Sequence, residues 1–147
     1  AVEEVNTTQL QQIITIARKR LGNLNSKRIT ILGTAFKPNT DDVRDSIAIE
    51  LIKKLLRKKV KITIHDPKAL ENTRKIFGNK INYSRSVGDA LSKSQCVILM
   101  TQWKQYEKLG NNEFKRMTKK IVIDGRRMLS GKQLDVDYFA IGLGKEK

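Results

Sequence analysis

The spacing of apolar residues changes several times along the chain, and each change predicts a new element. Over residues 6–21 apolar side chains recur every three or four positions, which is the spacing of one face of an α-helix. Residues 22–27 are typical of a linker. From Arg28 onward, short apolar runs alternate with helical patterns. The runs 96–100 and 121–124 have no polar alternation and predict strands buried on both faces.

This alternation predicts a sheet whose strands are separated by helices. Strands are expected at 28–33, 60–65, 81–83, 96–100, 121–124 and 138–141. Helices are expected at 46–58, 66–77 and 86–93, with helical segments at 104–109 and 113–117. Such a sequence of elements favours parallel strands joined by right-handed crossovers. The expected fold is α/β: a Rossmann-like, doubly wound, mainly parallel six-stranded sheet of order 3-2-1-4-5-6, preceded by an N-terminal helix.

The N-terminal helix stands outside the alternation. Asn6 or Thr7 is expected to cap its start. Because it does not take part in the alternation, we expect its apolar face to pack on something else, such as a missing domain or a partner subunit. That face consists of Leu10, Ile13, Ile14, Ala17 and Leu21.

The predicted strand order places a ligand crevice at one edge of the sheet. The first and fourth strands are neighbours, and the direction of the connections reverses between them, which is where open α/β sheets bind ligands. Three stretches follow the first, fourth and fifth strands: the loop 34–46, Thr101-Gln102-Trp103, and 124–127. We therefore expect these stretches to form the walls of the crevice.

Cations occupy fixed places in two of these stretches. Lys37 follows the first strand, Arg44 lies at a helix entrance, and Arg126 follows the fifth strand. A helix start and a planar guanidinium both favour phosphate, so the three predict a phosphate or sugar-nucleotide ligand, although singly each is also compatible with an ordinary surface charge. Asp41 and Asp42 are expected to pair with these cations. The first turn lacks G-x-G-x-x-G, so NAD is not expected there in the usual way.

Other candidate residues have simpler interpretations. Asp66, at the end of the second strand, could accept a ribose hydroxyl, but without the glycines a helix cap is favoured. His65 is interpreted as structural and Trp103 as a packing residue. Cys96, inside a central strand, is expected to be a buried apolar side chain rather than a nucleophile. With one cysteine and one histidine, neither a disulfide nor a structural metal site is expected.

Composition narrows the class of protein. The 147 residues, 39% hydrophobic and 31% charged, describe one globular domain. The net charge of +15 has two interpretations: a lysine-rich solvated surface, or an anionic partner such as a nucleotide, a nucleic acid or an acidic membrane. Aromatic residues, at 5%, do not alternate with the basic ones, which disfavours a nucleic-acid surface. No apolar run or basic leader predicts a membrane span or signal peptide, so a cytoplasmic location is expected.

Four motifs carry a family resemblance: G-T-A-F-K-P-N-T-D-D-V-R-D-S, H-D-P, V-I-L-M-T-Q-W and I-D-G-R-R. Together they resemble the C-terminal, UDP-binding domain of the UDP-glucose/GDP-mannose dehydrogenase family over residues 28–142, and most of all its UDP-glucose branch. The start, V-E-E-V-N-T-T-Q, is similar to the end of the central helix that joins the two halves of those enzymes and forms their dimer core. The resemblance implies that residues 1–24 end this helix and that 28–147 bind the UDP-sugar.

The family oxidises the C6 hydroxyl of a nucleotide sugar to a carboxylate in two NAD-dependent steps. By resemblance, Phe36 and Lys37 of F-K-P and Arg126 of D-G-R contact the substrate. Arg44 of D-V-R-D-S contacts the NAD diphosphate across the domain interface. The catalytic cysteine and lysine and the NAD-binding loop belong to an upstream half, so no catalytic residue is expected in this chain, and Cys96 does not match that cysteine.

The implied partners are the UDP-sugar, the N-terminal NAD-binding half and a second subunit of a homodimer. Neither a specific nucleic acid, a membrane nor a metal is implied. The chain departs from the family pattern at His65, Gln102 and Leu143. A GDP-mannose or UDP-N-acetylmannosamine dehydrogenase domain and a basic nucleic-acid-binding module remain the alternatives.

Overall fold

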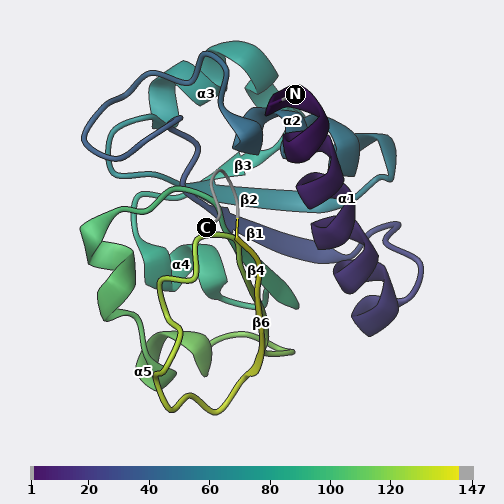
Figure 1. The fold of residues 1–147 in the computed structure, drawn as a ribbon, viewed down its shortest axis with the longest axis vertical. Helices are drawn as coiled ribbons and strands as arrows, with labels where there is room; N and C mark the ends of the chain where they lie inside the picture. The colour runs from purple at the N-terminus through teal and green to yellow at the C-terminus, as the bar shows by residue number, and fades with distance from the viewer. Residues whose placement is uncertain (1, 143–147) are drawn as a thin grey trace.

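The computed structural model describes residues 2–142, with side chains from residue 7 onward (Figure 1). A six-stranded sheet of order β3-β2-β1-β4-β5-β6 forms its centre, and every neighbouring pair is parallel. The expected strand order and α/β fold are confirmed. The strands are β1 (Arg28–Leu32), β2 (Lys61–His65), β3 (Asn82–Tyr83), β4 (Cys96–Leu99), β5 (Ile121–Asp124) and β6 (Asp137–Ala140).

Helices cover both faces of the sheet. They are α1 (Val2–Leu21), α2 (Ile47–Arg57), α3 (Leu70–Phe77), α4 (Val87–Leu91) and α5 (Asn111–Phe114), with 3-10 turns η1 (Gly78–Lys80) and η2 (Lys104–Lys108). Figure 1 shows α1, α2 and α3 on one side of the sheet and α4 and α5 on the other. None of the described helices has the length and apolar character needed to cross a bilayer.

The core lies where the sequence predicts it. Every residue of β4 and β5 is buried, as expected for strands without polar alternation. Cys96 is fully buried, and burial raises the pKa of its thiol. It is therefore a packing residue, as its place in a central strand predicts.

The helix α2 begins at Ile47, one residue after the predicted start at 46, because Ser46 is its N-cap. The Ser46 side chain accepts a hydrogen bond from the backbone N–H of Ala48 at 3.2 Å, which satisfies one free donor of the first turn. Its inner face is buried and consists of Ala48, Ile49, Leu51, Ile52 and Leu55.

The packing of α1 differs from the prediction. Its apolar face, from Leu10 to Leu21, is buried in the same core as the strands, so the expectation that this face packs on another domain or subunit is wrong. On this face of the sheet, α1 packs over β5 and beside α2. Arg20 forms an ion pair with Asp137 of β6, and Gln9 donates to the Gly142 carbonyl.

The predicted start of α1 is also wrong. The helix begins at Val2, so Asn6 and Thr7 lie inside it rather than at its cap. The apolar spacing over 6–21 predicts only the part of the helix whose face is buried. The turn before it lacks this spacing, so the prediction missed it. Leu143, one of the departures from the family pattern, lies outside the described residues.

Candidate functional site

The carboxyl ends of β1, β4 and β5 meet at one edge of the sheet. Backbone bonds join the segments that leave them: the Met100 N–H donates to the Leu32 carbonyl, and the Gly125 N–H donates to the Leu99 carbonyl, both at 2.9 Å. In Figure 1 the loop after β1 (dark blue) and the segment after β4 (green) leave the sheet on the same side. The predicted walls of the crevice are therefore neighbours.

A glycine allows two of these strand ends to approach closely. Gly33, directly after β1, has φ +95, and a Cβ on it would lie 2.5 Å from the Thr101 Cβ. The Thr101 hydroxyl donates to the Ala35 carbonyl at 2.7 Å and so links the two loops. The turn after β1 thus needs glycine for its conformation and for the contact with β4.

The loop after β1 presents an aromatic ring and an ammonium group to solvent. The Phe36 N–H donates to the Asp42 carbonyl at 2.9 Å, which closes a small loop that carries Lys37. Phe36 is 40% exposed, and the Lys37 Nζ lies 5.4 Å from the centroid of its ring. Both predicted substrate residues are thus on the exposed part of the loop, next to one another.

Arg44 lies on the same loop and is held by an acid two residues away. Its Nε donates to the Asp42 Oδ1 at 3.0 Å and its Nη2 to the Oδ2 at 2.8 Å. Hydrogen bonds from Arg44 lower the pKa of Asp42 to about 2. The expected pairing of Asp42 is therefore confirmed. The described side chains give Asp41 no ion-pair partner, so that half of the expectation is wrong; its carbonyl accepts from Asn72.

Arg126 lies in the opposite wall and is half-buried. Its Nε donates to the Met100 carbonyl at 2.9 Å, and burial lowers the pKa of its guanidinium. Asp124, fully buried at the end of β5, orders this wall. Its Oδ1 accepts from the Arg126 backbone at 3.1 Å, and its Oδ2 accepts from the Leu129 N–H and the Tyr138 hydroxyl, both at 2.7 Å. The three predicted cations thus share one edge of the sheet, with Arg126 at its base and Lys37 and Arg44 on the exposed loop.

Asp66 joins three segments of this edge. Only 2% of it is exposed, and both of its oxygens accept hydrogen bonds from the protein. The Oδ1 accepts from the backbone N–H groups of Lys68 and Ala69, and the Oδ2 accepts from those of Thr34 and Ala35 and from the Trp103 indole. Asp66 therefore caps the turn 67–69. The expected helix start at 66 is wrong, because α3 begins at Leu70 with Ala69 as its N-cap and without a side-chain cap bond. The alternative of a ribose acceptor is wrong because the carboxylate is buried.

These contacts also bear on NAD. In a dinucleotide-binding turn, backbone N–H groups after the first strand face the diphosphate. Here the N–H groups of Thr34 and Ala35 are bonded to a carboxylate, whose negative charge would repel a diphosphate. The turn after β1 therefore does not fit NAD, in agreement with its missing glycines.

His65 and Trp103 have structural surroundings. The His65 Nδ1 lies 2.8 Å from the Tyr106 hydroxyl, and burial lowers the pKa of the imidazole. Trp103 is 6% exposed. Its packing role is confirmed, while its bond to Asp66 was not predictable from spacing. No group of three or more His, Cys, Asp or Glu side chains gathers as a metal site in the described part of the chain.

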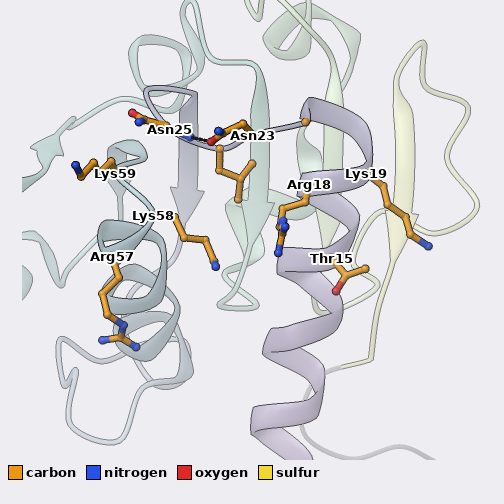
Figure 2. A pocket seen from close by; sticks show the side chains of 10 residues that line it. Thr15, Arg18, Lys19, Asn23, Asn25, Arg57, Lys58 and Lys59 are labelled. Atoms are coloured by element: carbon orange, nitrogen blue, oxygen red, sulfur yellow. Dashed lines mark hydrogen bonds between the residues drawn. The ribbon is translucent and has the colours of Figure 1, made fainter.

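A basic hollow of about 800 Å³ lies at the opposite edge of the sheet (Figure 2). Arg18 and Lys58 point toward it, whereas Lys19 and Lys59 point outward. Two helices, α1 and α2, end there, and the partial negative charge of their carbonyl ends is neutralised by basic residues in the last turn.

Comparison with protein families identifies one match. The model of the UDP-glucose/GDP-mannose dehydrogenase family, UDP binding domain, matches residues 30–131. This range contains all of the predicted substrate and cofactor contacts.

Named relatives and solved structures agree with this match. The chain is 39% identical over 138 residues to the UDP-glucose 6-dehydrogenase AglM of Haloferax volcanii, covering 94% of this chain and 31% of that protein. A UDP-glucose dehydrogenase structure from Pyrobaculum islandicum has a TM-score of 0.81 at 32% identity, covering 95% of this chain and 30% of that one. A GDP-mannose dehydrogenase structure from Pseudomonas aeruginosa, with a TM-score of 0.73 at 19% identity over 94% of this chain and 32% of that one, shares the fold. The chain thus spans about a third of these proteins.

Proposed function

The chain belongs to the UDP-glucose/GDP-mannose dehydrogenase family as its UDP-binding domain, and we propose that it provides the substrate site of an NAD-dependent enzyme that oxidises UDP-glucose to UDP-glucuronate. The observation that carries this proposal is the family match over 30–131, which spans both walls of the crevice. Phe36, Lys37 and Arg126 are the proposed substrate contacts. An exposed ring and two cations suit a ligand that combines a sugar, a base and a diphosphate.

UDP-glucose is favoured over the other sugars by the pattern of identities. The relatives named above at 39% and 32% identity act on UDP-glucose by name. The structural neighbours named for UDP-N-acetylmannosamine or GDP-mannose are 17–19% identical, which speaks for the fold alone. We therefore do not favour those substrates, nor a nucleic-acid module, for which the charge of +15 is the sole support.

We propose that NAD is bound mainly by the part of the enzyme outside this chain. When bound, NAD accepts the hydride that leaves the substrate. Arg44 is the residue of this chain proposed to reach the NAD diphosphate, since its guanidinium is exposed and is held by Asp42 just before α2. Without the NAD-binding half, the chain alone is expected to bind substrate weakly and to be inactive.

Homodimerisation through α1 and a cytoplasmic location complete the proposal. The inner face of α1 packs on its own sheet, so a second subunit would contact the outer face, where Gln11 and Gln12 are exposed. Deleting α1 would uncover the core, so the sharper test is Gln12→Arg. A dimer that keeps its mass in sedimentation despite this charge would count against α1 as the contact.

Kinetics of the full-length enzyme test the assignment. Lys37→Ala and Arg126→Ala are each expected to raise KM for UDP-glucose by about tenfold or more, because each removes a charged hydrogen-bond donor. Arg44→Ala should raise KM for NAD instead. Lys75→Ala, an exposed lysine of α3, is the control and should change neither constant.

Two results would contradict the proposal at different levels. Absence of NADH formation with any nucleotide sugar would reject the enzymatic function. A Lys37 variant with a raised KM for NAD alone would leave the function standing but overturn the assignment of the two cations.

A further inference from the structure

We propose that Asp66 is a positioning residue for the sugar nucleotide: its buried carboxylate fixes the loop after β1 in the conformation that binds substrate. The inference rests on the proposed function for the identity of the ligand. The inference about the behaviour of the loop does not depend on the proposed function, because that behaviour can be measured without any ligand.

The carboxylate is fully engaged by N–H donors. The two oxygens accept five hydrogen bonds of 2.8–3.2 Å, one more than the about four lone-pair sites of a carboxylate. The donors come from three segments that are distant in sequence: the loop after β1, the turn before α3 and the segment after β4. A single side chain at the end of β2 therefore joins segments around three adjacent strand ends.

A helix cap alone does not account for this arrangement. The Oδ1 is sufficient to cap the turn 67–69, because both backbone donors of that turn bind it. The Oδ2 serves only Thr34, Ala35 and the Trp103 indole, all of which belong to the crevice edge. The second oxygen is thus the part of Asp66 that the cap does not explain.

The fixed peptides lie directly before the proposed substrate residues. Ala35 is held at both ends, since its N–H donates to Asp66 and its carbonyl accepts from Thr101. The next residue, Phe36, is closed onto the Asp42 carbonyl. The base of the loop is therefore rigid while Phe36 and Lys37 face solvent. Holding a binding loop in its bound conformation removes an ordering cost from association.

Two variants of the full-length enzyme test this role. In Asp66→Asn one oxygen becomes an NH2 group, which cannot accept hydrogen bonds from the N–H donors that face it. The variant therefore loses part of the set of five hydrogen bonds, which we call the Asp66 clasp. Trp103→Phe keeps the carboxylate and removes one donor of five. The control, Thr30→Val, removes a buried bond of 2.6 Å to the Ala90 carbonyl from the middle of β1, away from the crevice.

The expected pattern separates positioning from stability. Asp66→Asn should raise KM for UDP-glucose about tenfold with little change in kcat or in KM for NAD, and Trp103→Phe should raise it about threefold. Thr30→Val should lower the Tm while leaving KM unchanged. Amide hydrogen exchange of residues 34–42, measured without ligand, should quicken in the two clasp variants only.

The outcomes are distinguishable. The inference is overturned if Asp66→Asn changes neither the amide exchange of residues 34–42 nor KM. It is also overturned if Thr30→Val raises KM as much as Asp66→Asn or Trp103→Phe does at an equal loss of Tm. If Asp66→Asn does not fold, Trp103→Phe decides on the same readouts. If the unmodified enzyme binds no UDP-sugar, the proposed function fails, whereas faster exchange in the variants would still assign the clasp to Asp66.

Discussion

Replacing Gly33 by alanine tests the close approach of β1 and β4, on which the crevice depends. A Cβ at this position would lie 2.5 Å from the Thr101 Cβ and 2.6 Å from its backbone nitrogen, so the strand end itself must move. The residue also has φ +95, a conformation that alanine adopts at a cost. Gly22 is a matched control, because its φ is +81 and nothing lies within 4 Å of the added Cβ.

The magnitude follows from the difference between the two variants. Both incur the left-handed conformational cost, about 1–2 kcal/mol, offset by about 0.4–1 kcal/mol from the less flexible unfolded chain. Gly33→Ala adds overpacking of about 1–3 kcal/mol and the strained Thr101–Ala35 bond of about 1 kcal/mol. We therefore expect Gly33→Ala to be less stable than Gly22→Ala by about 2–4 kcal/mol.

Thermal and denaturant unfolding of the two variants provide the assay. At about 3 °C per kcal/mol for a chain of this size, the Tm of Gly33→Ala should fall about 6–12 °C below that of Gly22→Ala. Equal Tm values would refute the reasoning, because they would show that the strand ends separate without cost and that the crevice wall is not fixed by this contact.

Two further predictions concern titrating groups. Arg44→Gln should raise the pKa of Asp42 from about 2 toward its ordinary 3.8. The rise should be incomplete, because the backbone N–H of residue 44 still donates to the Asp42 carboxylate. An NMR titration of the carboxyl group measures this pKa, and a value that stays near 2 would show that the Arg44 side chain does not lower it. Burial lowers the pKa of His65 from its ordinary 6.5, so the unfolded chain binds that proton more readily and the free energy of unfolding should decrease as the pH falls through about 6.5. His65→Asn, which removes the one histidine, should lose this slope in denaturant titrations between neutral and mildly acidic pH; the same slope in both proteins would assign it to other groups.

The strand order was predictable because it depends on local patterns. Fully apolar runs mark β4 and β5, helical spacing marks the crossovers, and the handedness rule then leaves few orders. The start of α2 was predictable to within one residue for the same reason, since a cap and the first turn it serves are adjacent in sequence.

The partners of each element were less predictable. The apolar stripe of α1 shows that one face of the helix is buried but does not identify what buries it. The sheet surface over β5 that receives this face forms only when the chain folds. Asp66 and Asp124 have the same limitation. An aspartate at a strand end predicts a local cap, whereas the donors from Thr34, Trp103 and Tyr138 come from segments brought together by the sheet. The cue for both was a carboxylate directly at the end of a buried strand.

The anchoring of α1 has a mechanical consequence. Its apolar face is embedded in the core, and Arg20 ties its last turn to β6. Residues 22–27 look like a linker in the sequence, but they join two bodies that are already fixed to one another: the Ser26 N–H donates to the Lys59 carbonyl, and the Lys27 carbonyl accepts from Lys61. These contacts make α1 and the sheet one rigid unit, so a displacement of the helix carries the strand ends of the crevice with it.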